Sequence, residues 1–319
     1  METRKLYYED PFQKGFATTV VSCDEVKGGY AVVLAETAFY PEGGGQPYDT
    51  GVLGEANVLE VHEKNGVITH LCDKPFEVGK SVSGKIDWAR RFDHMQQHSG
   101  EHICSGLICE RFHCDNVGFH MGADVVTIDF NADISWDELM EIEQLANLYI
   151  YEDHPIDIQF YRGAELDKVE YRSKKPLEGD VRIVSFPGAD CCACCGTHVV
   201  RSGQVGLVKF LSVQKFRDGV RIELLSGKRA HRYLSECWAQ DVRIAQALSV
   251  KPNASFAGVE RVLAELSALK QRCAKLEESV FAQTAAHGTV FQDLLLYQFE
   301  AAVRIPQKNQ SQHRHTVLV

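Results

Sequence analysis

The stretch that divides this sequence into its parts is DWARRFDHMQQHSGEHICSGLICERF, residues 87–112. It contains no proline, and Ile103, Leu107 and Ile108 recur at the spacing of one helix face. This pattern predicts an α-helix. The sequences on either side of it differ in character, so the helix marks a boundary between two kinds of structure.

The residues before this helix have the pattern of β-structure. Short apolar runs at 30–34 and 58–61 predict strands, and glycine clusters at 28–29 and 43–45 predict the turns between them. We therefore expect residues 1–90 to form a β-rich, barrel-like domain that carries a glycine motif.

The residues after the helix mix strands with a second helix. Alternating apolar residues predict strands at 123–130, 156–160, 182–186, 205–213 and 220–225. Ser135 followed by Glu138 is a capping box, which predicts a helix that runs to about residue 151. The predicted fold class is thus α+β, with an α+β domain over residues 91–235.

The C-terminal part carries a heptad pattern over residues 259–280, which predicts a helical, coiled-coil-like segment over 236–288. The pattern favours a homodimer formed through this face, although a helix packed on its own domain would show the same spacing. We expect residues 289–319 to be a disordered or truncated tail. The apolar positions are Val259, Val262, Leu266, Leu269, Cys273, Leu276 and Val280.

Composition excludes some classes of protein. No apolar stretch approaches the ~20 residues of a membrane-spanning helix, and the charged N-terminus lacks the apolar core of a signal peptide. Eleven cysteines, an odd number, indicate reduced thiols and metal ligation in the cytoplasm. The net charge of −10 argues weakly against a nucleic-acid partner.

Two short motifs predict a metal site. His98 and His102 lie one helical turn apart, so both imidazoles can reach one ion. Cys194 and His198 form a second pair, in a glycine- and cysteine-rich loop. Each spacing alone would occur about this often by chance in a sequence of this composition. Together the two pairs make a tetrahedral donor set suited to zinc, although iron or another divalent ion could bind. His94, one turn earlier, is an outer partner, a substrate contact or a surface histidine, and we favour the last two.

Other interpretations of these motifs stay open. Cys191, Cys192, Cys194 and Cys195 give overlapping C-x-x-C pairs, as in redox or iron–sulfur sites. Residues 98–102 also spell H-x-x-E-H, the inverted zinc-protease pattern, with Glu101 as its general base. That class needs a further acidic ligand, for which Glu141 or Glu143 could be proposed. A third interpretation is a zinc-stabilised RNA-binding module without catalysis.

Four motifs, in order, resemble the editing domain of alanyl-tRNA synthetase. They are residues 97–102, residues 194–199, the glycine motif FYPEGGGQP at 39–47 with Asp49 and Gly51, and residues 221–227. No aminoacylation motifs accompany them, so the chain is similar to the stand-alone editing proteins of AlaX type. Two departures stand out: Cys195 occupies the usual position of a glycine, and we do not expect the glycine-rich C-terminal domain of the longest members.

The resemblance implies a zinc-dependent deacylase that removes serine, or glycine, from mischarged tRNA(Ala). It implies an amino-acid pocket that includes Asn116 and His120 and an acceptor-end contact through Gly43, Gly44, Gly45 and Gln46. A cationic stretch at 209–232 is the expected tRNA contact, with a solvated surface as the equal alternative. Its candidate residues are Lys215, Arg217, Arg221, Lys228 and Arg229.

Overall fold

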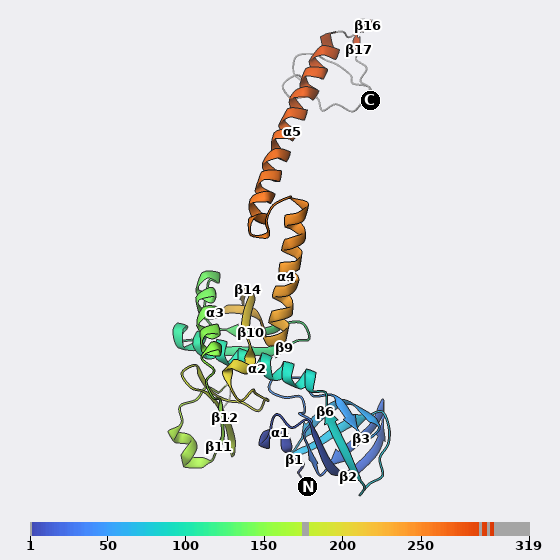
Figure 1. Ribbon diagram of the computed structural model, residues 1–319, viewed down its shortest axis with the longest axis vertical. Helices are drawn as coiled ribbons and strands as arrows, with labels where there is room; N and C mark the ends of the chain where they lie inside the picture. The colour runs from blue at the N-terminus through green and yellow to red at the C-terminus, as the bar shows by residue number, and fades with distance from the viewer. Residues whose placement is uncertain (1, 174–178, 287–288, 292–293, 297–319) are drawn as a thin grey trace. The chain divides into compact units, whose positions relative to one another are not determined.

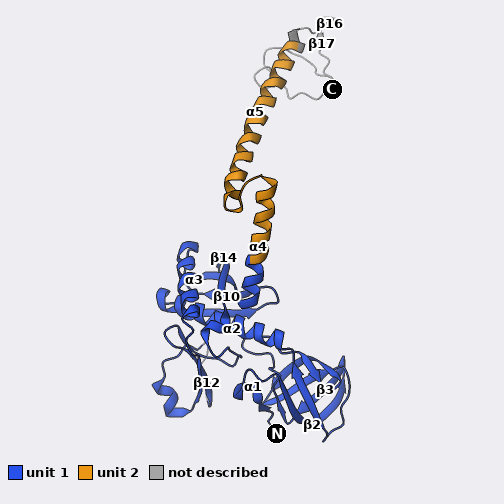
Figure 2. Cartoon of the chain, in the orientation of Figure 1, with its two compact units in different colours: residues 1–234 blue, residues 235–319 orange. Residues whose placement is uncertain are grey.

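The computed structural model describes residues 2–173, 179–286, 289–291 and 294–296 (Figure 1). The chain divides into two compact units, Met1–Leu234 and Ser235–Val319 (Figure 2). It is mixed α+β, with a β-rich N-terminal region and helices in the C-terminal unit, as the sequence predicts. None of the helices in these described ranges is both long and apolar enough to cross a bilayer.

The N-terminal strands close into a barrel of antiparallel neighbours. Along β7 every second side chain is buried, the two-residue period of a strand with one face on a core. The predicted strands lie within β3 and β6; the other barrel strands were not predicted. Around the barrel the strands are β2 (Gly15–Val26), β3 (Gly29–Leu34), β7 (Val67–Cys72), β6 (Ala56–Lys64), β5 (Gly51–Leu53) and β8 (Ser81–Ile86). The short elements β1 (Arg4–Lys5), α1 (Leu6–Glu9) and β4 (Glu36–Thr37) accompany it.

The predicted central helix is confirmed as α2 (Trp88–Phe112). Asp87 caps it by accepting the backbone N–H of Arg90 at 3.2 Å. The helix ends at His113, whose backbone is left-handed with φ of 50°. Nearly all side chains from His94 to Ser105 are buried, because α2 packs against several strands on different sides.

A buried ion pair joins α2 to the barrel region. Arg91 Nε donates to the two carboxylate oxygens of Asp49 at 3.2 and 3.0 Å, and both side chains are fully buried. The guanidinium also donates to the backbone carbonyls of Ala38 at 2.6 Å and Pro11 at 3.0 Å. Asp49 in turn accepts the Tyr40 N–H at 2.7 Å.

A four-stranded antiparallel sheet covers α2, in the order β14 (Val208–Phe216), β15 (Gly219–Ser226), β10 (Val126–Phe130) and β9 (Asn116–Met121). Ile128 and Ile222 of the sheet share a buried core with Ile103 of the helix. Helix α3 (Trp136–Tyr151) packs on β14 and begins at the predicted Ser135–Glu138 capping box, which is confirmed.

A smaller antiparallel sheet brings the cysteines to α2. Its order is β11 (Asp157–Tyr161), β12 (Val181–Phe186) and β13 (Asp190–Ala193), and β13 contacts α2. The 3-10 helix η1 (Gly163–Lys168) follows β11, and η2 (Ser202–Val205) precedes β14. Cysteines 194 and 195 therefore leave β13 beside the histidines of α2.

The C-terminal elements are helical, as the sequence predicts. Helix α4 (Gly227–Ala247) is followed by η3 (Pro252–Ala254) and by α5 (Ser255–Ala286). The heptad side chains of α5, such as Leu266 and Leu269, are exposed. Within the expected tail, β16 (Thr289–Phe291) pairs with β17 (Leu294–Leu296), and 297–319 lie outside the described residues.

Candidate metal centre

Four side chains from the two predicted motifs meet beside α2. The donor atoms of His98, His102, Cys194 and His198 all lie within 4.8 Å of one another. Cys194 Sγ is 3.4 Å from His98 Nε2 and 3.3 Å from His198 Nε2. The imidazoles are buried and the thiol is half-buried. The structure thus forms a cluster that could hold a metal ion.

Each imidazole is oriented by a partner at its other nitrogen. His98 Nδ1 donates to Gln46 Oε1 at 2.8 Å, and His102 Nδ1 donates to Asp190 Oδ2 at 2.7 Å. His198 Nδ1 lies 3.2 Å from the hydroxyl of Ser99. With Nδ1 occupied, each ring turns Nε2 toward the centre, as in histidines that bind metals.

Gly196 makes the turn between Cys194 and His198 possible. A Cβ atom at this position would lie 2.1 Å from Cε1 of His98, so any other residue would collide with a ligand ring. The Gly196 N–H also donates to Cys194 Sγ at 3.3 Å. The glycine therefore packs the loop against α2 and holds the thiol in place.

The electrostatics of the cluster favour a thiolate. Burial alone would raise the pKa of Cys194, but its imidazole neighbours, His98 first, lower it well below its usual range. Burial lowers the pKa of His198 to about 3, which keeps this imidazole neutral. Burial opposes ionisation of Asp190, but His102 and Arg172 lower its pKa. The carboxylate accepts from Arg172 at 2.7 and 2.8 Å.

The donor set fits a tetrahedral ion. Zinc–nitrogen bonds of about 2.0–2.1 Å and a zinc–sulfur bond of about 2.3 Å place nitrogen and sulfur about 3.6 Å apart in a tetrahedron. The two sulfur–nitrogen distances, 3.4 and 3.3 Å, are close to this separation. A second group within ligand range, His102, Asp190 and Cys192, shares its histidine with the first, and its carboxylate is held by Arg172.

A cavity of about 410 Å³ opens beside the cluster. Of the residues expected to bind substrate, Gly44 and Asn116 line it, together with Glu101. Glu101 Oε1 accepts from Ser105 at 2.6 Å and from Asn116 at 2.8 Å. Phe119 also lines the cavity, but sequence reasoning did not single it out.

The other expected pocket residues have different positions. His120 lies on strand β9; it is exposed and is not among the residues that line the cavity. Gln46 is buried, and its amide bonds to His98 and Thr197. Gly45 has φ of 84°, and a Cβ there would lie 2.5 Å from Phe119. This glycine serves close packing of the loop on β9.

The cationic stretch is mostly paired with carboxylates that are distant in sequence. Lys215 pairs with Asp133, Arg221 with Asp129 and Arg229 with Asp93. Arg217 lies over the ring of Phe216, 5.1 Å from its centroid. Lys228 lines a second cavity, together with Arg229.

Two alternatives lose support from the positions of their residues. The acidic ligand required by an inverted protease does not reach the cluster, since Glu141 pairs with Arg111 and Glu143 with Lys209. Cys195 is not in the candidate ligand group; its thiol lines the cavity and lies 3.9 Å from the hydroxyl of Tyr40.

Of the two roles favoured for His94, the surface histidine was wrong, because its side chain is only 3% exposed, and the substrate contact stays a prediction. The partners Gln46 and Asp190 were not identified as such from the sequence. A carboxylate four residues before a predicted ligand is the signal that could have indicated Asp190.

Comparison with known proteins gives the family. Residues 9–90 match the family model "tRNA synthetases class II (A)", and residues 181–223 match "Threonyl and Alanyl tRNA synthetase second additional domain". The chain is 31% identical to the alanyl-tRNA editing protein AlaX-L of Pyrococcus horikoshii, over 87% of this chain and 71% of that protein. It is 30% identical to the alanyl-tRNA editing protein Aarsd1-A of Xenopus laevis, over 82% of this chain and 68% of that protein. The chain belongs to the alanyl-tRNA editing protein family.

The matched regions of this alanyl-tRNA editing family member cover parts of the cluster. The match over residues 181–223 contains the turn from Cys194 to His198, and the match over 9–90 contains the barrel and Gln46. The chain is also 35% identical to the alanine–tRNA ligase of Pyrococcus abyssi, over 95% of this chain and 33% of the ligase. It therefore spans about a third of the length of the ligases that it matches.

Proposed function

We propose that this protein hydrolyses the ester between a wrongly attached amino acid and tRNA(Ala), with serine as the main substrate and glycine as a second. The ion is zinc, held by His98, His102, Cys194 and His198. The observation that carries the proposal is the three-imidazole, one-thiol cluster at the wall of a cavity. The names of the relatives supply the substrate class.

The need for such an activity follows from recognition chemistry. A pocket built for alanine rejects serine poorly, by roughly 10²-fold, because an added hydroxyl costs little in a small apolar site. Glycine is smaller and fits without a clash. A second site that cleaves the wrong ester corrects both errors.

The chain's own residues would place the substrate against the ion. When bound, zinc supplies Lewis-acid polarisation of the ester carbonyl. Ser105 and Asn116 hold Oε1 of Glu101, while Oε2 lies 4.0 Å from His102 Nε2. This second oxygen would accept a hydrogen bond from the ammonium group of the amino acid or from the attacking water.

The test is release of labelled serine from Ser-tRNA(Ala) by the full-length protein. Cys194→Ala should abolish release, as should a chelator, and Cys195→Ala should retain it because that thiol lines the cavity without belonging to the candidate ligand group. Ala-tRNA(Ala) should stay intact. Binding of tRNA without hydrolysis would instead favour the non-catalytic RNA-binding module.

A further inference from the structure

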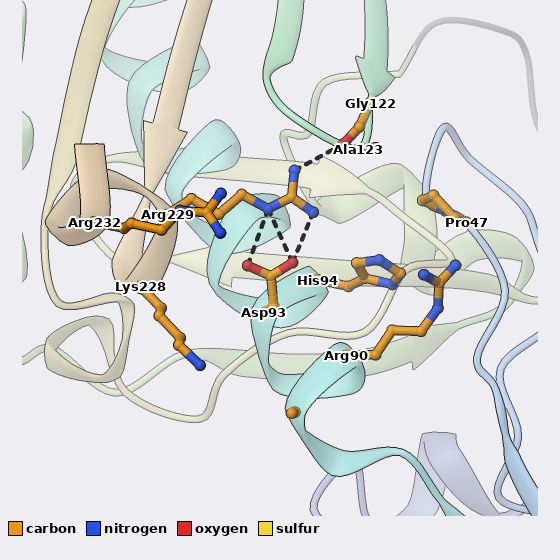
Figure 3. Close-up of a pocket in the computed structure, with 10 residues that line it drawn as sticks. Pro47, Arg90, Asp93, His94, Gly122, Ala123, Lys228, Arg229 and Arg232 are labelled. Atoms are coloured by element: carbon orange, nitrogen blue, oxygen red, sulfur yellow. Dashed lines mark hydrogen bonds and ion pairs between the residues drawn. The ribbon is translucent and has the colours of Figure 1, made fainter. Parts of the chain in front are cut away.

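A second cavity, of about 410 Å³, lies at the N-terminal ends of α2 and α4 (Figure 3). Four cationic side chains and a single carboxylate line it: Arg90, Lys228, Arg229, Arg232 and Asp93. The two helices are 25 and 21 residues long, and their N-termini add positive potential at the same place.

The carboxylate is already neutralised within the wall. Arg229 Nε lies 3.0 Å from both oxygens of Asp93, and Arg229 Nη2 donates to one of them at 2.7 Å. Arg229 Nη1 donates to the carbonyl of Gly122 at 2.7 Å, which fixes the guanidinium (Figure 3). Beyond this pair, Arg90 and Lys228 add positive charge to the lining, which an anion would balance.

His94 supplies an independent sign of a ligand. Its side chain lines this cavity between Arg90 and Arg229 (Figure 3), and it is 3% exposed. Within the described part of the chain, its Nδ1 has no hydrogen-bond partner. A buried polar atom without a partner costs about 1–3 kcal/mol, so it needs an explanation, and a bound group that pairs with it is one. Burial, and then Arg90 and Arg229, lower the pKa of His94 to about 3, so the ring is neutral and can donate one N–H.

The cavity and the one beside the metal centre are lined by the same three segments of the chain. Helix α2 lines this cavity with Arg90 and His94 and the other one with His98. The segment after β9 contributes Gly122 to this cavity, and β9 itself contributes Phe119 to the cavity beside the metal centre. The glycine loop contributes Pro47 to this cavity and Gly44 to the cavity beside the metal centre. One extended ligand could therefore lie along all three elements.

The distance between the two cavities corresponds to a few nucleotides. Arg90 and His98 are eight residues apart on one helix, a rise of about 12 Å at 1.5 Å per residue. Stacked nucleotides advance by about 3.4 Å each, so three or four of them cover this rise.

We propose that this cavity binds a backbone phosphate of the tRNA acceptor strand, three or four nucleotides from the ester at the metal centre. The proposal rests on the proposed function, because it takes the bound ester as its reference point. Lys228 and Arg232 contact the phosphate oxygens, and His94 Nδ1 donates to one of them.

The experiment compares two substrates in which serine is esterified to the same ribose hydroxyl. Ser-tRNA(Ala) carries the phosphates, whereas 3′-O-seryl-adenosine carries none. For Lys228→Gln, the ratio of kcat/KM on Ser-tRNA(Ala) to kcat/KM on seryl-adenosine should fall about three- to tenfold relative to wild type. The slope of log KM for the tRNA against log salt should fall by about 1. Lys27→Gln, the same change at an exposed barrel turn, should leave the ratio and the slope at their wild-type values.

An unchanged ratio and an unchanged salt slope in Lys228→Gln would overturn the proposal. So would binding of inorganic phosphate that depends on Lys228 when the tRNA ratio does not, since the cavity would then be a site for free phosphate. If wild-type protein cleaves neither ester, the proposed function fails. The cavity is then tested by the binding of uncharged tRNA(Ala), as the slope of the log binding constant against log salt concentration. A slope smaller in magnitude by about 1 in Lys228→Gln supports the phosphate contact, and a slope equal to that of wild type refutes it.

Discussion

Oε1 of Gln46 accepts a hydrogen bond from Nδ1 of His98 at 2.8 Å and another from the backbone N–H of Thr197 at 3.1 Å. The Gln46 amide also donates to the Thr197 hydroxyl at 2.9 Å. One side chain of the glycine loop thus fixes a histidine on α2 and the turn that carries Cys194 and His198. The position of the cluster depends on the N-terminal region as much as on its own two motifs.

Gln46→Leu should weaken metal binding by about 10- to 100-fold, the usual effect of losing an outer partner of a ligand histidine. Competition against a chromogenic chelator measures the affinity. Gln46→Glu keeps an acceptor for the His98 N–H and should stay closer to wild type. Equal affinities in wild type and Gln46→Leu would show that the contact does not orient the ring.

Metal removal should lower the midpoint temperature of thermal unfolding without loss of secondary structure at ordinary temperature. An ion that binds only the folded state stabilises it by mass action, while the apolar cores around Ile128 and Val32 consist mainly of residues outside the cluster, of whose members Cys194 packs against the first core. Circular dichroism with and without chelator tests this. Wild type and Cys195→Ala should both shift, and Cys194→Ala should not. A shift of equal size in Cys194→Ala would remove that thiol from the ligand set.

Arg91→Met should cost about 3–5 kcal/mol of stability, because it leaves the Asp49 carboxylate buried without its counter-ion. Adding Asp49→Asn should recover part of this loss, since the amide oxygen can still accept the Tyr40 N–H. Denaturant unfolding of wild type, Arg91→Met, Asp49→Asn and the double variant gives the coupling energy between the two side chains. Arg111→Met, on the same helix in a partly exposed ion pair, should cost less than about 1 kcal/mol. Purely additive losses would contradict the buried-charge explanation.

His70 should make the barrel less stable as the pH falls. Burial lowers the pKa of His70 to about 4, with Thr37 and the Val32 carbonyl as partners of the neutral ring. The unfolded chain, with a pKa near 6.5, takes up the proton first. The stabilisation is therefore present above about pH 6.5 and is lost between pH 6.5 and 4, by about 3 kcal/mol in total. The difference in unfolding free energy between wild type and His70→Gln should narrow across this range, and a constant difference would refute the assignment.

The heptad face of α5 should drive self-association. Leu266 and Leu269 are exposed, so replacing both with glutamate should shift a dimer to a monomer in analytical ultracentrifugation. Gln271→Glu adds charge away from this face and should leave the mass unchanged. A monomeric wild-type protein would show that the heptad face of α5 does not form a dimer interface.

Local sequence signals predicted the elements that depend on neighbouring residues. The Ser135–Glu138 capping box and the helix around His98 are examples, because their contacts lie within four residues along the chain. The spacing of His98 and His102 also predicted that both imidazoles would lie in one cluster, since residues one helical turn apart share a face.

The remaining features arise from contacts between distant segments. Arg221 meets Asp129, 92 residues earlier, so a cationic run in the sequence became a set of ion pairs. His94 is buried because α2 is covered on several sides, which a single helical pattern does not reveal. Gln46 found its partner 52 residues away, and no spacing rule connects them.

The separation of the two ligand pairs along the chain also sets an order in time. His98 and Cys194 are 96 residues apart, and ribosomes add roughly 5–20 residues per second. The thiol therefore emerges about 5–20 s after His98, and His198 follows it. All the strands of the barrel precede α2 in the chain, so the barrel can finish folding during this delay. Binding of an ion by all four side chains is consequently a late event in the synthesis and folding of this protein. A nascent chain stalled before Cys194 would carry a complete barrel and an incomplete metal centre.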